Sequence, residues 1–301
     1  METNPLFDMH FLHSEIQEAV NQALTEDRTR YDVTTRALVQ SELIGRAVII
    51  CKADGVLAGI DTAKETFRQV DPSINFVAQK KDTAVLTPCT PNSATDSNLI
   101  AKVNGSLASI LTAERTALNF LQHLSGIAST TNKYVQAIQD HNCIILDTRK
   151  TIPGLRELQK YAVAVGGGKN HRKNLGDGVL IKDNHIKAAA IEGLSLAGVI
   201  ERARERAPSN MKVEVEVETL EQVQEAVDVG ADILLLDNMT LSQLYAAVSL
   251  VSGRAITEAS GGVTLANVAD IAATGVDMIS VGALTHSANA LDISLDIVEI
   301  T

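Results

Sequence analysis

The second half of the chain alternates short strand-like runs with segments of helical periodicity. From Cys143 onward, brief apolar or alternating runs are separated by longer segments in which apolar residues recur every three or four positions. The runs predict strands at Ile144–Leu146, Val179–Ile181, Val213–Val217, Ile233–Leu236, Ala255–Thr257 and Met278–Val281. The periodic segments predict helices at Leu155–Val165, Leu194–Ala207, Leu220–Val229, Leu241–Val251 and Leu265–Ala273. Strands that alternate with helices are typical of a parallel sheet.

The polar residues that end these runs favour a closed barrel over an open sheet. Each predicted strand ends in, or is followed by, charged residues, serine or glycine, namely Arg149 and Lys150, Lys182, Glu216 and Glu218, Asp237, Glu258 and Ser260, and Gly282. In a barrel all carboxyl ends of the strands meet at one mouth, where barrel enzymes keep their chemistry. An open sheet would concentrate function at one switch point instead. With six clear strands, we expect an incomplete barrel.

The first part of the chain predicts a mixed α+β region. We expect a helix at Ser14–Leu24, a strand at Gly45–Ala53 and a helix at Asp61–Val70 that Asp61 caps. Asp54-Gly55 is a hairpin signal after the first strand. Turn signals at Asp82, Pro88, Pro91 and Asn92 precede a strand at Leu99–Val103, and a long helical pattern opens at Thr112.

The strand Val213–Glu218 alternates valine with glutamate. Glu214, Glu216 and Glu218 therefore share one face, and the valines share the other. We expect the valines to face the outer helices and the carboxylates to face the barrel interior and its mouth. Such carboxylates need cationic partners, metal or water, because an unpaired buried charge is costly. The alternative is an edge strand with a solvated acidic face, which the flanking helices disfavour.

The composition predicts a soluble protein, and the distribution of cations predicts a local cationic site. The chain has 301 residues, 45% of them hydrophobic, and a net charge of −11, which predicts two domains and excludes a nucleic-acid-binding tail. Cations nevertheless gather between Cys143 and Ile186, which suggests a small anionic ligand. Cys51, Cys89 and Cys143 have neither disulfide nor metal spacing. Without a basic n-region in the first ten residues or an apolar stretch of ~20 residues, we expect no signal peptide, no membrane span and a cytoplasmic location.

Two glycine-rich passages are candidate anion sites. Gly166-Gly167-Gly168 directly precedes a cationic segment, and it is either a helix C-cap or a loop that closes over an anion. Ser260-Gly261-Gly262 lies between a predicted strand and a helix, and Gly282 ends the next strand, as in the phosphate sites of barrel enzymes. The passage Gly166-Gly167-Gly168 fits neither the mononucleotide nor the dinucleotide glycine pattern. His171 and His185 could bind a metal, although no zinc spacing surrounds them.

Together these residues describe a mouth at which cations face carboxylates. Cations suit a substrate with carboxylates and phosphates, and carboxylates suit Mg²⁺ or ribose hydroxyls. No Ser/His/Asp or Cys/His nucleophile arrangement is present in the sequence pattern. A Schiff-base aldolase that uses Lys150 or Lys182 remains an alternative, as does a non-catalytic protein that binds a phosphorylated metabolite.

Long motifs then resemble one family. LTAERTALNFLQ, DTRKTIPGLR, NHRKNLGDGVLIKDNHI, EVEVE, LLLDN, EASGGV and SVGALTHS are similar to those of quinolinate phosphoribosyltransferase, in family order and over almost the whole chain. The resemblance implies an N-terminal α/β sandwich over 1–116, joined by 287–301, and an incomplete TIM-like α/β barrel over 117–286. It implies a homodimer with shared active sites. It also implies Mg²⁺-dependent conversion of quinolinate and phosphoribosyl pyrophosphate to nicotinate mononucleotide, pyrophosphate and CO₂ in NAD biosynthesis. A non-decarboxylating relative that acts on another ring stays open.

The resemblance also implies a role for each site residue. Arg149, His171 and Arg172 would hold the quinolinate carboxylates, together with Arg115 of the partner subunit. Lys150 and Lys182 would bridge substrate and pyrophosphate. Glu216 and Asp237 would hold the ribose and magnesium, directly or through the substrate. The 5′-phosphate would be bound by Ser260, Gly261 and Gly282.

Overall fold

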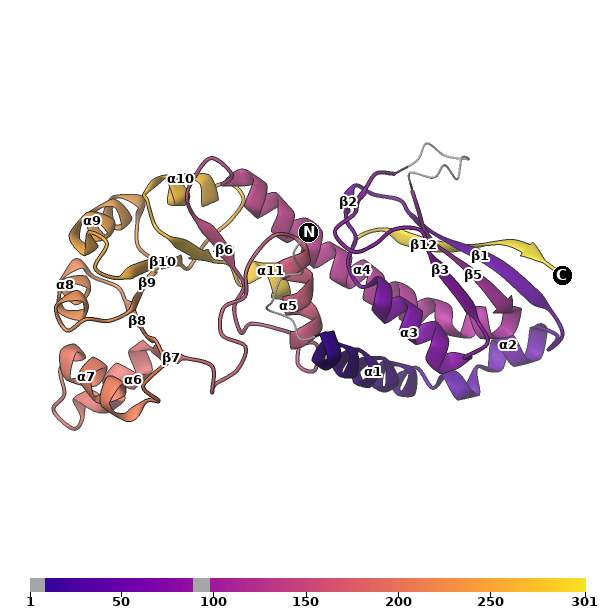
Figure 1. The fold of residues 1–301 in the computed structure, drawn as a ribbon, viewed down its shortest axis with the longest axis horizontal. Helices are drawn as coiled ribbons and strands as arrows, with labels where there is room; N and C mark the ends of the chain where they lie inside the picture. The colour runs from indigo at the N-terminus through magenta and orange to yellow at the C-terminus, as the bar shows by residue number, and fades with distance from the viewer. Residues whose placement is uncertain (1–8, 89–97) are drawn as a thin grey trace. The chain divides into compact units, whose positions relative to one another are not determined.

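The computed structural model describes residues 9–88 and 98–301 (Figure 1). The first eight residues, on which the signal-peptide expectation largely rests, lie outside the described part, as do Cys89 and the turn signals at Pro91 and Asn92. The chain divides into two compact units. Unit 1 comprises residues up to 132, 151–167 and 284–301, and unit 2 comprises 133–150 and 168–283. The boundary expected at residue 116 stays a prediction about family domains. The compact units divide after residue 132, in the helix Leu107–Ala137 that also contains Thr116.

Unit 1 is built on an antiparallel sheet of four strands. Their order is β12-β1-β5-β3, with β1 at Ile44–Cys51, β3 at Asn75–Ala78, β5 at Leu99–Ser106 and β12 at Ile293–Ile300. The helices α3 (Ile60–Val70) and α4 (Leu107–Ala137) cover one face of it (Figure 1). The core between them is apolar and includes Ile49, Phe67, Ile100 and Leu121. The other elements described are α1 (Met9–Glu26), η1 (Thr29–Tyr31), α2 (Val33–Leu38), β2 (Gly55–Val56), β4 (Val85–Leu86), α5 (Arg156–Val165) and α11 (Ala283–His286).

The predicted hairpin at Asp54-Gly55 is wrong. The strand β1 pairs with β5 and with β12 from the far end of the chain, whereas β2 pairs only with β4. The alternating pattern of β1 buries Ala47, Ile49 and Cys51 on the core face. That pattern specifies which face of β1 is buried, but it does not specify which strand pairs with β1. The turn signal at Asp54-Gly55 therefore predicted the wrong partner. The helix α4 also begins at Leu107, before the predicted Thr112.

The predicted cap of α3 is also wrong. Its N-cap is Gly59, which has φ +95°, and Asp61 lies inside the first turn. The carboxylate of Asp82 takes the capping role, because it accepts hydrogen bonds from the backbone N–H groups of Gly59 (2.8 Å) and Ile60 (3.1 Å). The Tyr161 hydroxyl donates a third bond to it at 2.8 Å. Burial raises the pKa of Asp82, and these hydrogen bonds oppose the rise.

We expect Asp82→Ala to lower the free energy of unfolding by about 2 kcal/mol or more, because it leaves two helix N–H groups and a tyrosine hydroxyl without their acceptor. The matched control is Asp61→Ala, which should cost about 0.5 kcal/mol or less, since Asp61 contributes only its charge near the helix start. Urea unfolding of both variants checks this. Equal losses in the two variants would contradict the assignment of the cap.

Unit 2 contains the parallel sheet, as the alternation of strands and helices in the sequence predicts. Its six strands run in the order β6-β11-β10-β9-β8-β7 and are all parallel, so the sheet is open between β6 and β7. They are β6 Ile144–Leu146, β7 Val179–Ile181, β8 Val213–Val217, β9 Ile233–Asp237, β10 Ile256–Ser260 and β11 Met278–Ser280. The helices α7 (Leu196–Arg206), α8 (Leu220–Asp228), α9 (Leu241–Val251) and α10 (Val268–Ala273) lie along its outer side (Figure 1). The α/β fold class with a parallel C-terminal domain is confirmed.

One helix of unit 2 was not predicted. The segment Asp183–Ala190 forms α6 directly after β7, although its first turn is polar and carries no apolar period. Local capping explains it, because the backbone N–H of Lys182 donates to His185 Nδ1 at 2.9 Å. This bond places His185 in a structural role at the helix start.

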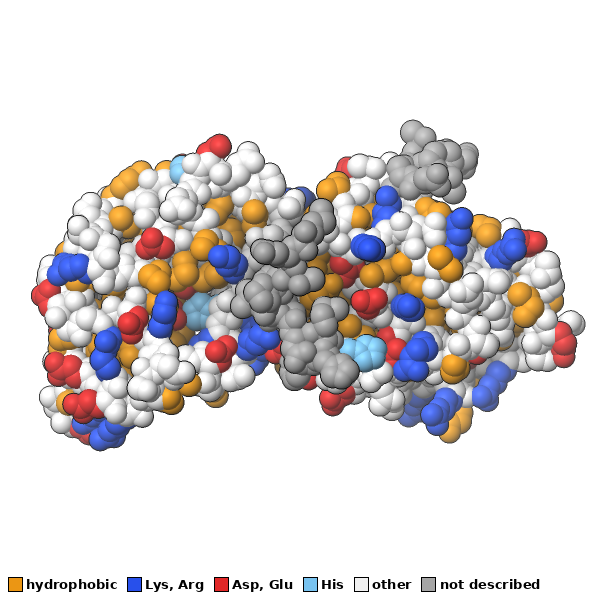
Figure 2. Space-filling view, in the orientation of Figure 1, with side chains coloured by type: hydrophobic (Ala, Val, Ile, Leu, Met, Phe, Trp, Pro, Cys, Tyr) orange, Lys and Arg blue, Asp and Glu red, His pale blue; other side chains and the backbone are white. Residues whose placement is uncertain are grey.

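The surface of the described residues carries charges of both signs. Lys and Arg side chains are interspersed with Asp and Glu side chains over the face seen in Figure 2. Among the described helices, none combines the length and the apolar content that a membrane crossing requires.

Candidate active site

A cavity of about 580 Å³ opens at the carboxyl ends of the strands of unit 2. All six strands, or the residues directly after them, contribute to its lining. The residues are Thr148, Arg149, Lys150, His171, Arg172, Leu180, Lys182, Glu216, Leu235, Asp237, Asn238, Glu258, Ser260, Gly261, Gly262 and Ser280. This is the mouth at which a barrel collects its functional groups.

Most of the predicted site residues meet there. The cavity gathers the cations Arg149, Lys150, Arg172 and Lys182, and with them His171, Glu216, Asp237, Ser260 and Gly261. Gly282 follows β11 and lies outside the lining, where Ser280 takes part instead. Arg115 lies on α4 and lines a different cavity, of about 470 Å³, within unit 1.

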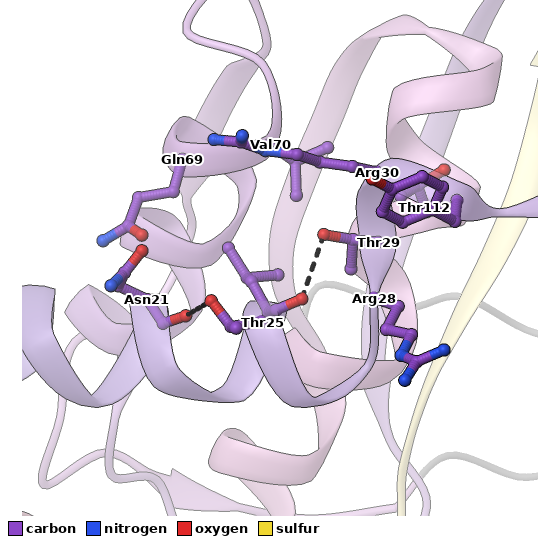
Figure 3. Close-up of a pocket in the computed structure, with 10 residues that line it drawn as sticks. Asn21, Thr25, Arg28, Thr29, Arg30, Gln69, Val70 and Thr112 are labelled. Atoms are coloured by element: carbon purple, nitrogen blue, oxygen red, sulfur yellow. Dashed lines mark hydrogen bonds between the residues drawn. The ribbon is translucent and has the colours of Figure 1, made fainter.

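A further cavity of about 390 Å³ in unit 1 lies between the end of α1, η1 and α3 (Figure 3). Two of its hydroxyl groups donate to the local backbone. Thr25 Oγ1 donates to the carbonyl of Asn21 at 2.8 Å, and Thr29 Oγ1 donates to the carbonyl of Leu24 at 3.2 Å. None of the predicted site residues lines it, so the chemistry belongs to the cavity of unit 2.

Lys182 and Glu216 form an ion pair across the mouth. Lys182 Nζ lies 2.9 Å from Glu216 Oε2, and 48% of the lysine side chain is exposed against 12% of the glutamate side chain. On the next strand, burial and then the charge of Glu216 raise the pKa of Asp237. Two neighbouring carboxylates that repel each other this way favour a cation between them.

His171 and the buried Glu258 form the floor of the cavity, and a second buried carboxylate, that of Glu214, lies against them. The ring of His171 lies with Nε2 3.1 Å from Glu214 Oε2 and 3.5 Å from Glu258 Oε2. The backbone N–H of Arg172 donates to Nδ1 of the same ring at 2.8 Å. Nδ1 therefore carries no proton, and Nε2–H donates to Glu214. Both ring nitrogens make contacts within the chain, and the donor role expected for His171 stays a prediction.

The sequence pattern placed Glu214 correctly on the inner face of β8 but missed its partner. Glu258 is 1% exposed, and neither of its oxygens meets a hydrogen-bond donor in good geometry within the described chain. Burial, followed by the charge of Glu214, raises the pKa of Glu258 to about 7, while His171 and Ser280 oppose the rise. These three groups lie close enough together to hold a metal ion, although one proton shared between the carboxylates relieves the same repulsion.

Two arginines stand side by side at the cavity. Burial and then the charge of Arg149 lower the pKa of Arg172, while Glu214 and Asp177 oppose this. Like charges held together in a partly buried place need an anion to balance them, and a guanidinium pairs with a carboxylate in a bidentate fork. This end of the cavity suits a carboxylate ligand.

The turn after β10 has the backbone of an anion cradle. Gly261 and Gly262 have φ +89° and +61°, the left-handed region that favours glycine. A Cβ on Gly261 would lie 2.2 Å from Asn238 Oδ1, so only glycine fits there. The other glycine passage behaves as a helix end, since Gly166 caps α5 and Gly167 has φ +94°. The loop that would close over an anion stays a prediction.

Comparison with known proteins identifies the family. The model of the quinolinate phosphoribosyl transferase C-terminal domain matches residues 127–296, and that of the N-terminal domain matches residues 32–125. The chain belongs to the quinolinate phosphoribosyltransferase family. It is 39% identical over 285 residues to a probable nicotinate-nucleotide pyrophosphorylase [carboxylating] of Bacillus subtilis, with 95% of this chain and 94% of that protein covered. It is 42% identical over 299 residues to quinolinate phosphoribosyltransferase [decarboxylating] 2b of Nicotiana tabacum, with 94% and 82% covered.

Solved structures agree. The crystal structure of NadC from Streptococcus pyogenes superposes with a TM-score of 0.87 at 40% identity, covering 100% of this chain and 99% of that one. The nicotinate-nucleotide pyrophosphorylase from Francisella tularensis gives a TM-score of 0.86 at 39% identity, with 95% and 96% covered. The resemblance drawn from the motifs is confirmed over the full chain, and the protein is a pentosyltransferase.

Several lining residues of this phosphoribosyltransferase were absent from the predicted site. Thr148 and Ser280 each lie at or just after a strand end, as does Asn238, which directly follows Asp237, and Leu180 lies within β7. Their position at the carboxyl end of a strand was the available signal. It is weak by itself, because only the tertiary structure separates residues that point inward from those that point outward.

Proposed function

We propose that this chain transfers the phosphoribosyl group of phosphoribosyl pyrophosphate to the ring nitrogen of quinolinate, with loss of the 2-carboxylate. The products are nicotinate mononucleotide, pyrophosphate and CO₂, as in de novo NAD biosynthesis. One observation carries the proposal: a single cavity holds four cations, two mouth carboxylates and a glycine turn of left-handed backbone. A dicarboxylate, a ribose and a phosphate need those three kinds of group together.

In this proposal the quinolinate carboxylates pair with Arg149 and Arg172, beside His171. Lys150 and Lys182 bridge towards the pyrophosphate. The 5′-phosphate binds at the turn Ser260–Gly261 and the backbone near Gly282. Lys182 must exchange its partner when the substrates arrive, because in the ligand-free chain its ammonium is held by Glu216. The same ion pair holds the Lys182 amine against a carboxylate, which disfavours the Schiff-base alternative, since that chemistry needs an amine free to attack a carbonyl.

Magnesium is part of the proposal, and the residues present fit it. Glu216 and Asp237 line the cavity together, and burial and mutual repulsion raise the pKa of Asp237, which a divalent cation would offset. These two carboxylates would hold the ion directly or through the ribose hydroxyls. When bound, Mg²⁺ supplies positive charge to the oxygens of the leaving pyrophosphate.

The residues divide the chemistry by charge. As the C1′–pyrophosphate bond breaks, positive charge develops on the ribose, which Glu216 and Asp237 stabilise, and negative charge develops on pyrophosphate, which Lys150 and Lys182 stabilise. The ring nitrogen then forms the new bond to C1′. When CO₂ leaves, its bonding electron pair stays on ring carbon C2, beside the cationic ring nitrogen, and C2 takes up a proton.

The test uses the purified chain with carboxyl-labelled quinolinate, phosphoribosyl pyrophosphate and Mg²⁺. We expect labelled CO₂ and nicotinate mononucleotide in equal amounts, and neither product when phosphoribosyl pyrophosphate is omitted. Absence of CO₂ release from the complete mixture would overturn the proposal. Covalent trapping of a carbonyl substrate by borohydride at Lys150 or Lys182 would support the aldolase reading instead.

Quinolinate affinity is expected to fall as pH rises through about 7, the pKa of Glu258. Below that pH the carboxyl is protonated and neutral, and above it the floor gains a negative charge that repels a dianion. We expect a loss of roughly threefold to tenfold between pH 6 and pH 8. Glu258→Gln removes the titration and should flatten the profile, which calorimetric titration with quinolinate measures. The same slope in Glu258→Gln would assign the effect to another group.

We further infer a homodimer in which Arg115 completes the site of the partner subunit, and a cytoplasmic location, which suits cysteines without a disulfide framework. The expected result is complementation. Arg115→Ala and Lys182→Ala chains are each inactive alone, yet mixed and reassorted dimers should recover about a quarter of wild-type activity, since about half of them contain one intact site of two. Activity no higher than that of the parents, with subunit exchange verified, would return Arg115 to its own chain.

A further inference from the structure

Asn238 has an unusual backbone for its residue type. It directly follows β9 and has φ +53°, in the left-handed region that residues with a side chain rarely adopt. Asparagine tolerates this region better than most residues, but the conformation still needs support from its surroundings. Asn238 lines the cavity of unit 2, and such local strain gathers at functional sites.

Three contacts supply that support, one with Asp237 at the end of β9 and two with the turn at the end of β10. The side-chain Nδ2 donates to Asp237 Oδ2 at 2.7 Å. The backbone N–H donates to the carbonyl of Ser260 at 2.9 Å. The side-chain Oδ1 lies against Gly261, where an added Cβ would be only 2.2 Å away. One residue therefore contacts both the carboxylate at the end of β9 and the glycine turn at the end of β10.

We propose that Asn238 is a positioning residue that holds the Asp237 carboxylate and the Ser260–Gly261 turn at one fixed separation. This inference rests on the proposed function, in which Asp237 binds the ribose and the turn binds the 5′-phosphate. A ribose 5-phosphate group spans those two elements. Because the separation between the Asp237 carboxylate and the turn is already fixed, the ribose hydroxyls and the phosphate bind together. The protein then loses less conformational freedom when the ligand binds.

Other residues cannot meet these contacts together. Aspartate would replace the amide donor by an oxygen and set a second negative charge against Asp237. Alanine would lose the side-chain contacts and keep an unfavourable backbone. Glycine would adopt the left-handed backbone freely and lose only the side chain, so Asn238→Gly isolates the role of the amide.

The experiment measures binding of ribose 5-phosphate and of inorganic phosphate to wild type and Asn238→Gly by calorimetric titration. Ribose 5-phosphate engages both elements, whereas inorganic phosphate engages only the turn. We expect the preference for ribose 5-phosphate over inorganic phosphate to shrink roughly tenfold in Asn238→Gly. The KM for phosphoribosyl pyrophosphate should rise by a similar factor, while quinolinate affinity stays unchanged. Asn238→Asp should lose more than Asn238→Gly.

The matched control is Ser252→Gly, since Ser252 also has a left-handed backbone, φ +48°, but lies at the end of α9 outside the lining of the cavity. It should leave the preference intact. An unchanged preference in Asn238→Gly, or an equal loss for both ligands, would overturn the inference. The binding measurement needs no turnover, so a chain that binds ribose 5-phosphate as expected but releases no CO₂ would overturn the proposed function alone.

Discussion

Replacing Glu216 by glutamine and Asp237 by asparagine in one chain is expected to lower turnover about a hundredfold to a thousandfold. The amides keep the size and hydrogen-bonding shape of the side chains but remove the negative charge that faces the developing positive charge on the ribose. They also remove the carboxylates proposed for magnesium. Steady-state rates at saturating substrates measure the loss, and quinolinate affinity should stay close to wild type.

The exposed carboxylate of Glu221, in the first turn of α8, supplies the control, because Glu221→Gln removes a charge that does not line the cavity. Near wild-type turnover in the double amide variant would move the ribose and magnesium roles to Glu218 or Glu258. One secondary effect is expected. Glu216→Gln weakens the ion pair with Lys182, so Lys182 should become more mobile in the ligand-free chain.

Arg172→Ala is expected to weaken quinolinate binding tenfold to a hundredfold, since a hydrogen bond to a charged group contributes roughly 1.5–3 kcal/mol. Arg172 stands in a partly buried place beside Arg149, where solvent offers little compensation. Lysine should rescue poorly, because an ammonium cannot form the bidentate fork that holds a carboxylate. Calorimetric titration with quinolinate measures the affinity of wild type, Arg172→Ala and Arg172→Lys.

Lys187→Ala is the control for loss of a nearby surface cation. Lys187 is exposed, and its ammonium lies 2.6 Å from Asp183 on the same helix, an arrangement that contributes little to binding or stability. It should bind quinolinate as wild type does. An Arg172→Ala chain with unchanged affinity would remove Arg172 from the quinolinate site.

Local physics explains why the parallel unit could be predicted. Three of its strands have the predicted residue bounds, because β6 and β7 are short apolar runs, β8 alternates valine with glutamate, and each is followed by a charged residue. The alternation of valine and glutamate in β8 likewise predicted which side chains point inward, and Glu214 and Glu216 do. The period of two in a strand is a backbone property, so it can be read without knowing the neighbours.

Tertiary structure decided what depends on partners distant in the sequence. The strand β1 could not reveal that β12, from the other end of the chain, lies beside it, and the helix α3 could not reveal that Asp82 caps it. Neither the strand pairing nor the helix cap can be predicted from a short window of sequence.

The site divides in the same way. The charged residues at the strand ends were predicted by type and position, because a barrel brings those ends together whatever the intervening helices are. The pairing of Glu214 with Glu258 through His171, and the contacts of Asn238 with Asp237 and Gly261, depend on distances between neighbouring strands. The sequence by itself thus determined which charged groups the mouth contains. Only packing of strand against strand decided which of them touch, and therefore which carry a raised pKa or a fixed orientation.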